Sequence, residues 1–288
     1  MKRDFSTISP SAKSIIEMKA HTSIPFALEA AKLVALPSDF SPDYENNDRA
    51  FWGRVLHFEA RDLSINQLLD DLDIGNILEL SSGYSFRGLE RSSKKGIFYI
   101  DTDLPELIAQ KKEMLKNLDH DKGSGVLELL PLNALDEMQF RETVKIFPPG
   151  EIAIMNEGLL IYFSMKEKEA LCGIIHRILE ERGGCWITSD IYIRATTNGS
   201  KIGNDEKLDK FSKEHNIEDN KFVSIEQAKE FFENNGFTIE REESLDMSGI
   251  SSFKYFMRSL GGDIPLKSGG AGKMQTTWRL RIAEARRE

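Results

Sequence analysis

The stretch ILELSSGYSFRGLERSSKKGIFYIDTDLP, residues 77–105, decides the fold because it joins two apolar runs through a glycine-containing loop. Residues 77–80 and 97–100 are short apolar runs of the kind that form buried strands. The connection between them is long enough for a helical crossover, so the two strands are expected to be parallel. Parallel sheets bind ligands at the carboxyl ends of their strands. The loop and the acidic residues after the second run are therefore expected to face one ligand site.

The side chains of this stretch indicate a cofactor that contains a ribose. Asp101 and Asp103 lie about 20 residues beyond the loop, where a carboxylate can accept hydrogen bonds from both ribose hydroxyls. After Gly83 the loop lacks both the G-x-G-x-x-G spacing of dinucleotide sites and the Gly-Lys-Ser/Thr of a Walker loop. Arg87 stands where a hydrolase nucleophile elbow has its second glycine. Glu79, a carboxylate inside an apolar strand, favours a cofactor with a partly cationic tail, and S-adenosylmethionine fits this description.

Composition narrows the class of protein further. The 288 residues can form one large α/β domain with insertions, which is favoured over two small domains. A net charge of -9 argues against a nucleic-acid partner, which requires a basic surface. Cys172 and Cys185 suggest neither a disulfide framework nor a zinc site, and the five histidines have no metal-ligand spacing. The sequence shows no signal peptide and no membrane span, so a cytoplasmic protein is predicted.

Strands and helices alternate along the remainder of the chain, which predicts a parallel sheet covered on both faces. The last two strands follow each other without a helical crossover, so they are expected to be antiparallel. The outline is an α/β fold whose mostly parallel sheet is closed by one antiparallel strand. The expected strands are residues 77–80, 97–100, 126–130, 152–155, 185–189, 237–240 and 276–282.

Two further segments bear on the site. Apolar residues recur at helical spacing before the first strand, with Pro25 marking a break between two helices. Residues 1–73 are therefore expected to form a helical cap, and residues 74–288 the cofactor-binding core. The polar residues 195–220 form an insertion that is either a lid or a solvated surface loop, and their composition favours the loop.

Three motifs match one protein family. Residues 77–87 correspond to a strand and a glycine loop that ends in arginine, residues 99–105 (YIDTDLP) to an acidic strand end, and residues 157–163 (EGLLIYF) to a Glu-Gly-Leu-Leu-x-Tyr element. With them the chain resembles the leucine carboxyl methyltransferase group, which includes tetracenomycin-type polyketide O-methyltransferases. The resemblance covers most of the chain. It implies a Rossmann-like class I methyltransferase with a seven-stranded sheet and S-adenosyl-L-methionine as cofactor.

For the nucleoside half of that cofactor, the resemblance implies that Asp103 binds the ribose hydroxyls and that Leu104 packs on the adenine. Asn133 and Ala134 would meet the adenine edge. Position 133 departs from the family, which usually has aspartate there, but an amide still offers a donor and an acceptor. Asp103 also has a second reading, as the N-cap of the helix that begins near Pro105.

The amino-acid half is assigned in the same way, to Lys19, Arg61, Glu79, Ser81, Gly83 and Glu157. Arg61 is the stronger candidate for the cofactor's carboxylate, because a guanidinium can form two hydrogen bonds to it, whereas Lys19 is at least as well explained as a surface residue. Glu157 would lie beside the sulfonium. Tyr162 would face the acceptor, unless it serves core packing alone. The family usually has glycine and aspartate at the positions of Ser81 and Ser85.

The resulting hypothesis is an S-adenosylmethionine-dependent O-methyltransferase that acts on a small-molecule carboxylate or phenol, with polyketide or secondary metabolism as its setting. No residue stands out as a general base, which favours a carboxylate that is already ionised at neutral pH. A nicotinamide-dependent oxidoreductase and a non-catalytic cofactor-binding protein remain as alternatives. A monomer and a homodimer are both compatible with the sequence.

Overall fold

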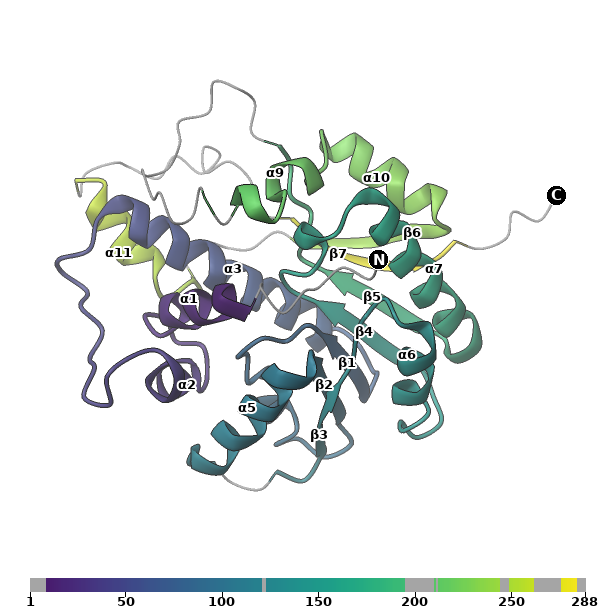
Figure 1. Ribbon diagram of the computed structural model, residues 1–288, viewed down its shortest axis with the longest axis horizontal. Helices are drawn as coiled ribbons and strands as arrows, with labels where there is room; N and C mark the ends of the chain where they lie inside the picture. The colour runs from purple at the N-terminus through teal and green to yellow at the C-terminus, as the bar shows by residue number, and fades with distance from the viewer. Residues whose placement is uncertain are drawn as a thin grey trace.

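The computed structural model describes residues 9–120, 123–194, 210, 212–243, 249–261 and 276–283, which form a seven-stranded sheet with helices on both faces (Figure 1). The strands are β1 (Asn76–Leu80), β2 (Phe98–Asp103), β3 (Val126–Pro131), β4 (Ile152–Asn156), β5 (Gly184–Thr188), β6 (Phe237–Glu243) and β7 (Thr277–Ile282). Their order in the sheet is β3-β2-β1-β4-β5-β7-β6. Strands β1 to β5 pair in parallel, and β7 runs antiparallel between β5 and β6. The predicted Rossmann-like, mostly parallel sheet with one antiparallel strand is confirmed.

The helices begin and end where local signals place them. Ser164 and Glu167 form a capping box at the start of α7, and Gly183 ends that helix with a φ of 74°. Ser224 caps α10 by accepting a hydrogen bond from the backbone N–H of Gln227. The helices are α1 (Ser9–Lys19), α2 (Ala27–Val34), α3 (Arg49–Asp70), α4 (Arg87–Arg91), α5 (Pro105–Asn117), α6 (Glu137–Val144), η2 (Leu160–Tyr162), α7 (Met165–Arg182), α9 (Ile217–Asn220), α10 (Ile225–Asn234) and α11 (Phe253–Ser259).

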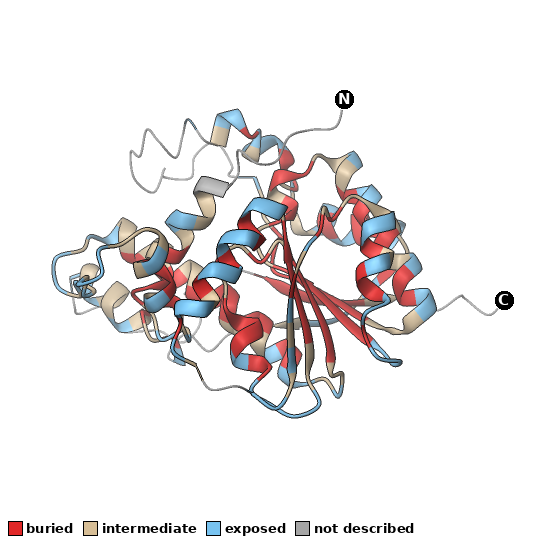
Figure 2. Ribbon diagram, turned by 60° about the horizontal axis from the view of Figure 1, so that its bottom comes forward, coloured by how far each residue is buried: buried red, intermediate tan, exposed pale blue. Residues whose placement is uncertain are grey.

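The central strands β1, β2, β4 and β5 are buried on both faces (Figure 2). Leu78 and Ile154 belong to the core that α6, α7 and α10 cover, whereas Ile77 and Ala153 belong to the core on which α3 packs. Neighbouring residues of one strand thus point to opposite faces. This two-sided burial explains why the central strands read as continuous apolar runs in the sequence.

The N-terminal helices lie at one side of the sheet, together with α11 (Figure 1). Helices α1 and α2 share a small core with the glycine loop and with α5. The 22-residue α3 has two surroundings: Leu56 packs near α11, and Ile65 and Leu68 pack on the sheet. Because α3 belongs to both parts, the division of the chain at residue 73 stays a prediction.

Most of the polar insertion lies outside the described residues, namely 195–209 and 211, and with it the predicted lid. The part that follows is packed against η2 and α7. Lys168, which is buried, donates hydrogen bonds to the carbonyl oxygens of Phe163 and Asn220. The side chain of Asn220 donates to the carbonyl of Ile161 at 3.1 Å. In the described part of the chain, none of the helices has both the length and the apolar character needed to cross a bilayer.

Candidate functional site

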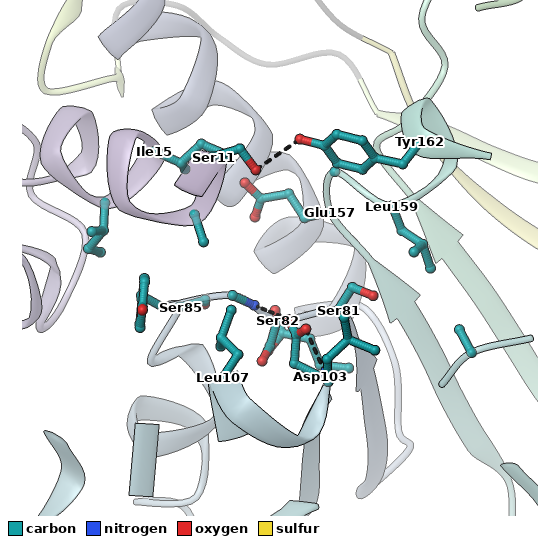
Figure 3. A pocket seen from close by; sticks show the side chains of 18 of the residues that line it. Ser11, Ile15, Ser81, Ser82, Ser85, Asp103, Leu107, Glu157, Leu159 and Tyr162 are labelled. Carbon is teal, nitrogen blue, oxygen red and sulfur yellow. Dashed lines mark hydrogen bonds between the residues drawn. The ribbon is translucent and has the colours of Figure 1, made fainter. Parts of the chain in front are cut away.

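A cavity lies at the carboxyl ends of β1, β2 and β4, with α1 over it (Figure 3). Its walls come from the loops after β1, β3 and β4, from the start of α5, and from α1 and α3. All eleven residues predicted for the site line it, although their distances in the sequence reach 143 positions: Lys19, Arg61, Glu79, Ser81, Gly83, Asp103, Leu104, Asn133, Ala134, Glu157 and Tyr162. The structure therefore places these residues at one site, and the role of each stays a prediction.

The cavity's edge at β2 is formed by Asp103. The sequence suggested that Asp101 and Asp103 come after this strand. That was wrong, because β2 extends through Asp103 and both aspartates belong to its end. One carboxylate oxygen of Asp103 accepts a hydrogen bond from the N–H of Gly83 at 2.8 Å, and the other accepts from the N–H of Leu104 at 2.7 Å (Figure 3). Burial raises the pKa of Asp103, and these two N–H groups oppose the shift. Leu104 occupies the N-cap position of α5, so the reading of Asp103 as the helix cap was wrong.

Asp101, two residues earlier, anchors the loop from behind. It forms a buried ion pair with Lys111 at 2.6 Å, and Lys111 also donates to the hydroxyl of Ser82 at 2.9 Å. Ser82 in turn donates a hydrogen bond to Asp101. Asp101 does not line the cavity, so only Asp103 of the two aspartates is placed to meet a ligand.

The loop after β1 turns through two left-handed residues, Ser81 with a φ of 53° and Gly83 with a φ of 56°. The left-handed region costs a non-glycine residue about 1–2 kcal/mol, which explains why glycine suits position 81 in the family that the sequence resembles. The N–H of Ser82 donates to the carbonyl of Thr102 at 2.9 Å and joins the loop to β2. A Cβ atom at Gly83 would lie 3.6 Å from that of Ala12, so α1 packs directly on the loop.

At the opposite edge, Glu157 follows β4 and is surrounded by three cationic side chains. Lys19 lies 2.9 Å from one carboxylate oxygen, Arg87 lies 2.8 Å from the other, and the Nε atom of Arg61 lies within 3.7 Å. Burial alone would raise the pKa of Glu157, but the three cations hold it below its ordinary value. Lys19 also contacts Asp62 at 3.2 Å and is 4% exposed, so the alternative reading of Lys19 as a surface residue was wrong.

Arg87 is a member of this cluster whose partners were not predicted. Its two terminal nitrogens lie 2.6 Å from Glu79, 2.7 Å from Asp62 and 2.8 Å from Glu157, which ties β1, α3 and β4 together. Burial raises the pKa of Glu79, and the guanidinium of Arg87 opposes this shift. Tyr99 donates a further hydrogen bond to Glu79 at 2.6 Å. Glu79 was the signal in the sequence that could have identified Arg87 as a partner. A carboxylate in a buried strand requires a partner, and an arginine follows in the same motif.

Arg61 lies at the boundary between Glu157 and the end of β5. Its Nη1 atom donates to the hydroxyl of Tyr192 at 2.5 Å, and its Nη2 atom lies 3.6 Å from Asp190. Its Nε atom is buried and has no hydrogen-bond partner among the described residues. Buried N–H groups are nearly always satisfied, so this donor is an exception; the Glu157 carboxylate lies 3.7 Å from it, beyond hydrogen-bond distance.

Tyr162 lies both in the core and at the cavity, so its role toward an acceptor stays a prediction. Its ring belongs to the main core cluster, and it also lines the cavity. Its hydroxyl donates a hydrogen bond to Ser11 of α1 at 3.0 Å (Figure 3). Burial raises the pKa of this hydroxyl, so it stays protonated at neutral pH. Within the described ranges, no group of three or more His, Cys, Asp or Glu side chains is arranged to hold a metal ion.

Comparisons with known proteins establish the fold. No protein-family model matches the chain, and no curated protein sequence matches it. A DUF574 family protein from Streptomyces avermitilis superposes with a TM-score of 0.56 at 12% identity, over 94% of this chain and 97% of that chain. The magnesium protoporphyrin IX methyltransferase of Synechocystis PCC 6803 with bound SAH gives a TM-score of 0.48 at 10% identity, over 84% and 90% of the two chains. The fold is Rossmann-like.

Proposed function

We propose that this protein is an S-adenosylmethionine-dependent O-methyltransferase that acts on a small molecule. The observation that carries the proposal is one cavity with two carboxylates in opposite electrostatic surroundings. Asp103 is held by backbone N–H groups, and Glu157 lies among three cations. A ribose needs an acceptor for two hydroxyls, and an amino-acid tail needs groups of both signs. S-adenosylmethionine contains both parts.

At the nucleoside end, the residues present fit the cofactor. Each oxygen of Asp103 accepts one backbone hydrogen bond and retains a lone pair for a ribose hydroxyl. The side-chain oxygen of Asn133 accepts from the N–H of Leu135 at 3.1 Å, which leaves its NH₂ group as a donor for the adenine edge. Leu104 and Ala134 add apolar walls at the same place.

At the amino-acid end, Lys19 and Arg61 would bind the carboxylate, while Glu157 would bind the ammonium group. Arg61 supports this assignment because its Nε atom is a donor without a hydrogen-bond partner among the described residues. Gly83 lets the loop backbone lie close to the ligand, since it has no side chain and adopts a left-handed conformation. The mixture of charges favours an amino-acid tail over a purely anionic one such as a pyrophosphate.

The bound cofactor would supply a methyl carbon activated by a sulfonium. The residues of the cavity then have to align an acceptor oxygen with this carbon and exclude water, and such positioning is worth roughly 7–11 kcal/mol in favourable cases. Tyr162 and Ser11, which line the cavity, would orient the acceptor. The carboxylates that line the cavity all hold hydrogen bonds or ion pairs, so none is free to act as a base. We therefore propose a carboxylate acceptor ahead of a phenol, because a carboxylate needs no deprotonation at neutral pH. The resemblance alone supports a setting in polyketide or secondary metabolism.

Calorimetry with S-adenosylhomocysteine and with NAD tests the proposal. We expect binding of the former and none of the latter, and the reverse would favour the nicotinamide oxidoreductase. A second assay supplies a labelled methyl group on the cofactor and offers a panel of carboxylic acids and matched phenols. Transfer to an acid supports the proposal, whereas cofactor binding without transfer to any member of the panel or to any metabolite of an added cell extract would indicate a non-catalytic binding protein.

A further inference from the structure

Two side chains just beyond β5 have no part in the proposed function so far, although both contact residues that do. Asp190 is 2% exposed, and Tyr192 follows it two residues later. Neither lines the cavity. A buried carboxylate is expensive to keep ionised unless its hydrogen-bonding capacity is filled, so the partners of Asp190 indicate what it holds in place.

Asp190 fixes the backbone that follows Glu157. One of its oxygens accepts from the N–H of Gly158 at 2.6 Å, and the other accepts from the N–H groups of Leu159 at 2.6 Å and Leu160 at 2.9 Å. The side-chain amide of Asn156 also donates to this second oxygen of Asp190, at 2.7 Å. These four donors lie on both sides of Glu157 in the sequence. They therefore determine where the Glu157 carboxylate stands relative to the cavity.

The same two side chains hold Arg61. The Nη2 atom of Arg61 lies 3.6 Å from Asp190, and its Nη1 atom donates to Tyr192 at 2.5 Å. A Cβ atom at Gly158 would lie 3.0 Å from Nη2, so the loop that Asp190 fixes also limits where the guanidinium can lie. With both terminal nitrogens held on the β5 side, the Nε edge is turned toward Glu157, which lines the cavity.

His57 completes the arrangement behind Tyr192. Its Nε2 atom lies 3.4 Å from the tyrosine hydroxyl. Burial, assisted by the charge of Arg61, lowers the pKa of His57 to about 3, so the ring is neutral and can accept the tyrosine proton. The tyrosine oxygen is then oriented to accept from Arg61.

We infer that Asp190 and Tyr192 are positioning residues for the amino-acid half of the cofactor, Asp190 through Glu157 and Arg61, and Tyr192 through Arg61 alone. The inference rests on the proposed function. It differs from a general structural role in one measurable respect, since a positioning defect affects the amino-acid half of the ligand and leaves the nucleoside half untouched.

The test compares two ligands, S-adenosylhomocysteine and 5′-methylthioadenosine, the second of which lacks the amino-acid group. In wild type, backbone N–H groups donate to both carboxylate oxygens of Asp190. In Asp190→Asn, one of these oxygens is replaced by an NH₂ group, which cannot accept their hydrogen bonds. We expect its Kd for S-adenosylhomocysteine to rise about tenfold or more, with the Kd for methylthioadenosine within about twofold of wild type. Tyr192→Phe removes one hydroxyl without changing shape, and we expect a rise of about threefold for S-adenosylhomocysteine only.

Glu59→Gln is the matched control. Glu59 is also a buried carboxylate that accepts backbone hydrogen bonds, from Ser251 and Ser252 at 2.9 Å each, but it does not line the cavity or contact Arg61. We expect the ratio of the two Kd values to equal that of wild type. If Asp190→Asn weakens both ligands equally, or neither, the positioning role is refuted; if that variant does not fold, the ratio in Tyr192→Phe decides. Failure of the wild type to bind S-adenosylhomocysteine would instead overturn the proposed function.

Discussion

The carboxyl ends of β2 and β4 present the same functional group to one cavity by different means. At β2, Asp103 is held by two backbone N–H groups, and burial raises its pKa. At β4, Glu157 is held by the side chains of Lys19, Arg61 and Arg87, which lower its pKa. The β2 end depends on the local course of the backbone, whereas the β4 end depends on charges brought from distant elements. The two ends should therefore respond differently to mutation and to pH.

The largest expected effect is on the β4 end. Arg87→Met leaves Glu79, Asp62 and part of Glu157 without their shared cation, and removal of one partner from a buried ion cluster costs about 3–5 kcal/mol. Urea denaturation should show this loss of unfolding free energy. The control, Arg177→Gln, removes a solvent-exposed ion pair with Glu137 and should leave the transition nearly unchanged. Equal stability of the two variants would contradict the description of Arg87.

The β2 end should control ligand binding with a smaller loss of stability. Asp103→Asn removes the ionised acceptor for the ribose. The Kd values for S-adenosylhomocysteine and methylthioadenosine should both rise about 100-fold, which corresponds to a loss of about 3 kcal/mol in the free energy of binding. Asp136→Asn, at the N-cap of α6, changes an aspartate outside the cavity and should leave both values unchanged. A loss confined to S-adenosylhomocysteine would show that Asp103 does not bind the nucleoside.

The pH dependence of binding should separate the two carboxylates. Ribose hydroxyls require the ionised form of Asp103, whose pKa is raised, so affinity should fall as the pH drops through that raised pKa, by at most about tenfold per pH unit. Glu157, whose pKa is lowered, stays ionised over the same range. The apoprotein changes in the opposite sense at Asp103, because a carboxyl with a raised folded-state pKa favours folding more as the pH falls. Calorimetry should show the loss of affinity in wild type and a flat profile in Asp103→Asn.

The smallest expected effect concerns the backbone of the β2 end. Ser81 has a φ of 53°, and glycine adopts this conformation without a side-chain clash. Ser81→Gly should raise the free energy of unfolding by up to about 1 kcal/mol, as measured by thermal denaturation. Ser93→Gly, an exposed serine without a positive φ, should lower it slightly. A stability loss in both variants would show that residue 81 carries no strain.

Local patterns in the sequence predicted the strands well, because buried parallel strands are short apolar runs bounded by polar residues. The prediction failed where the chain changes chemistry within an element. Strand β2 continues through Asp101 and Asp103, since its pairing with β3 extends to Pro131, and polar residues at a strand end look like a loop. The motifs also brought together residues that line one cavity, because each motif follows a strand of the same sheet.

The partners of the charged residues could not be predicted in the same way. Arg87 meets Asp62 and Glu157, which lie 25 and 70 positions away, and Asp190 meets a loop about 30 positions before it. No periodicity or spacing links such residues, because their proximity depends on the packing of α3 on the sheet and on the adjacency of β4 to β1 and β5. Lys19 shows the limit most clearly, since only the docking of α1 converts a helix-terminal lysine into a buried one.

The position of α1 also bears on when the site can form. Its residues Lys19 and Ser11 find Glu157 and Tyr162 as partners 138 and 151 positions later in the chain. During synthesis this helix leaves the ribosome before its partners have been made. Contacts of such long range form late in folding, because loop closure precedes any gain from them. Docking of α1 therefore requires the chain through Tyr162, so the cavity cannot close on Lys19 and Ser11 before β4 and η2 have been made.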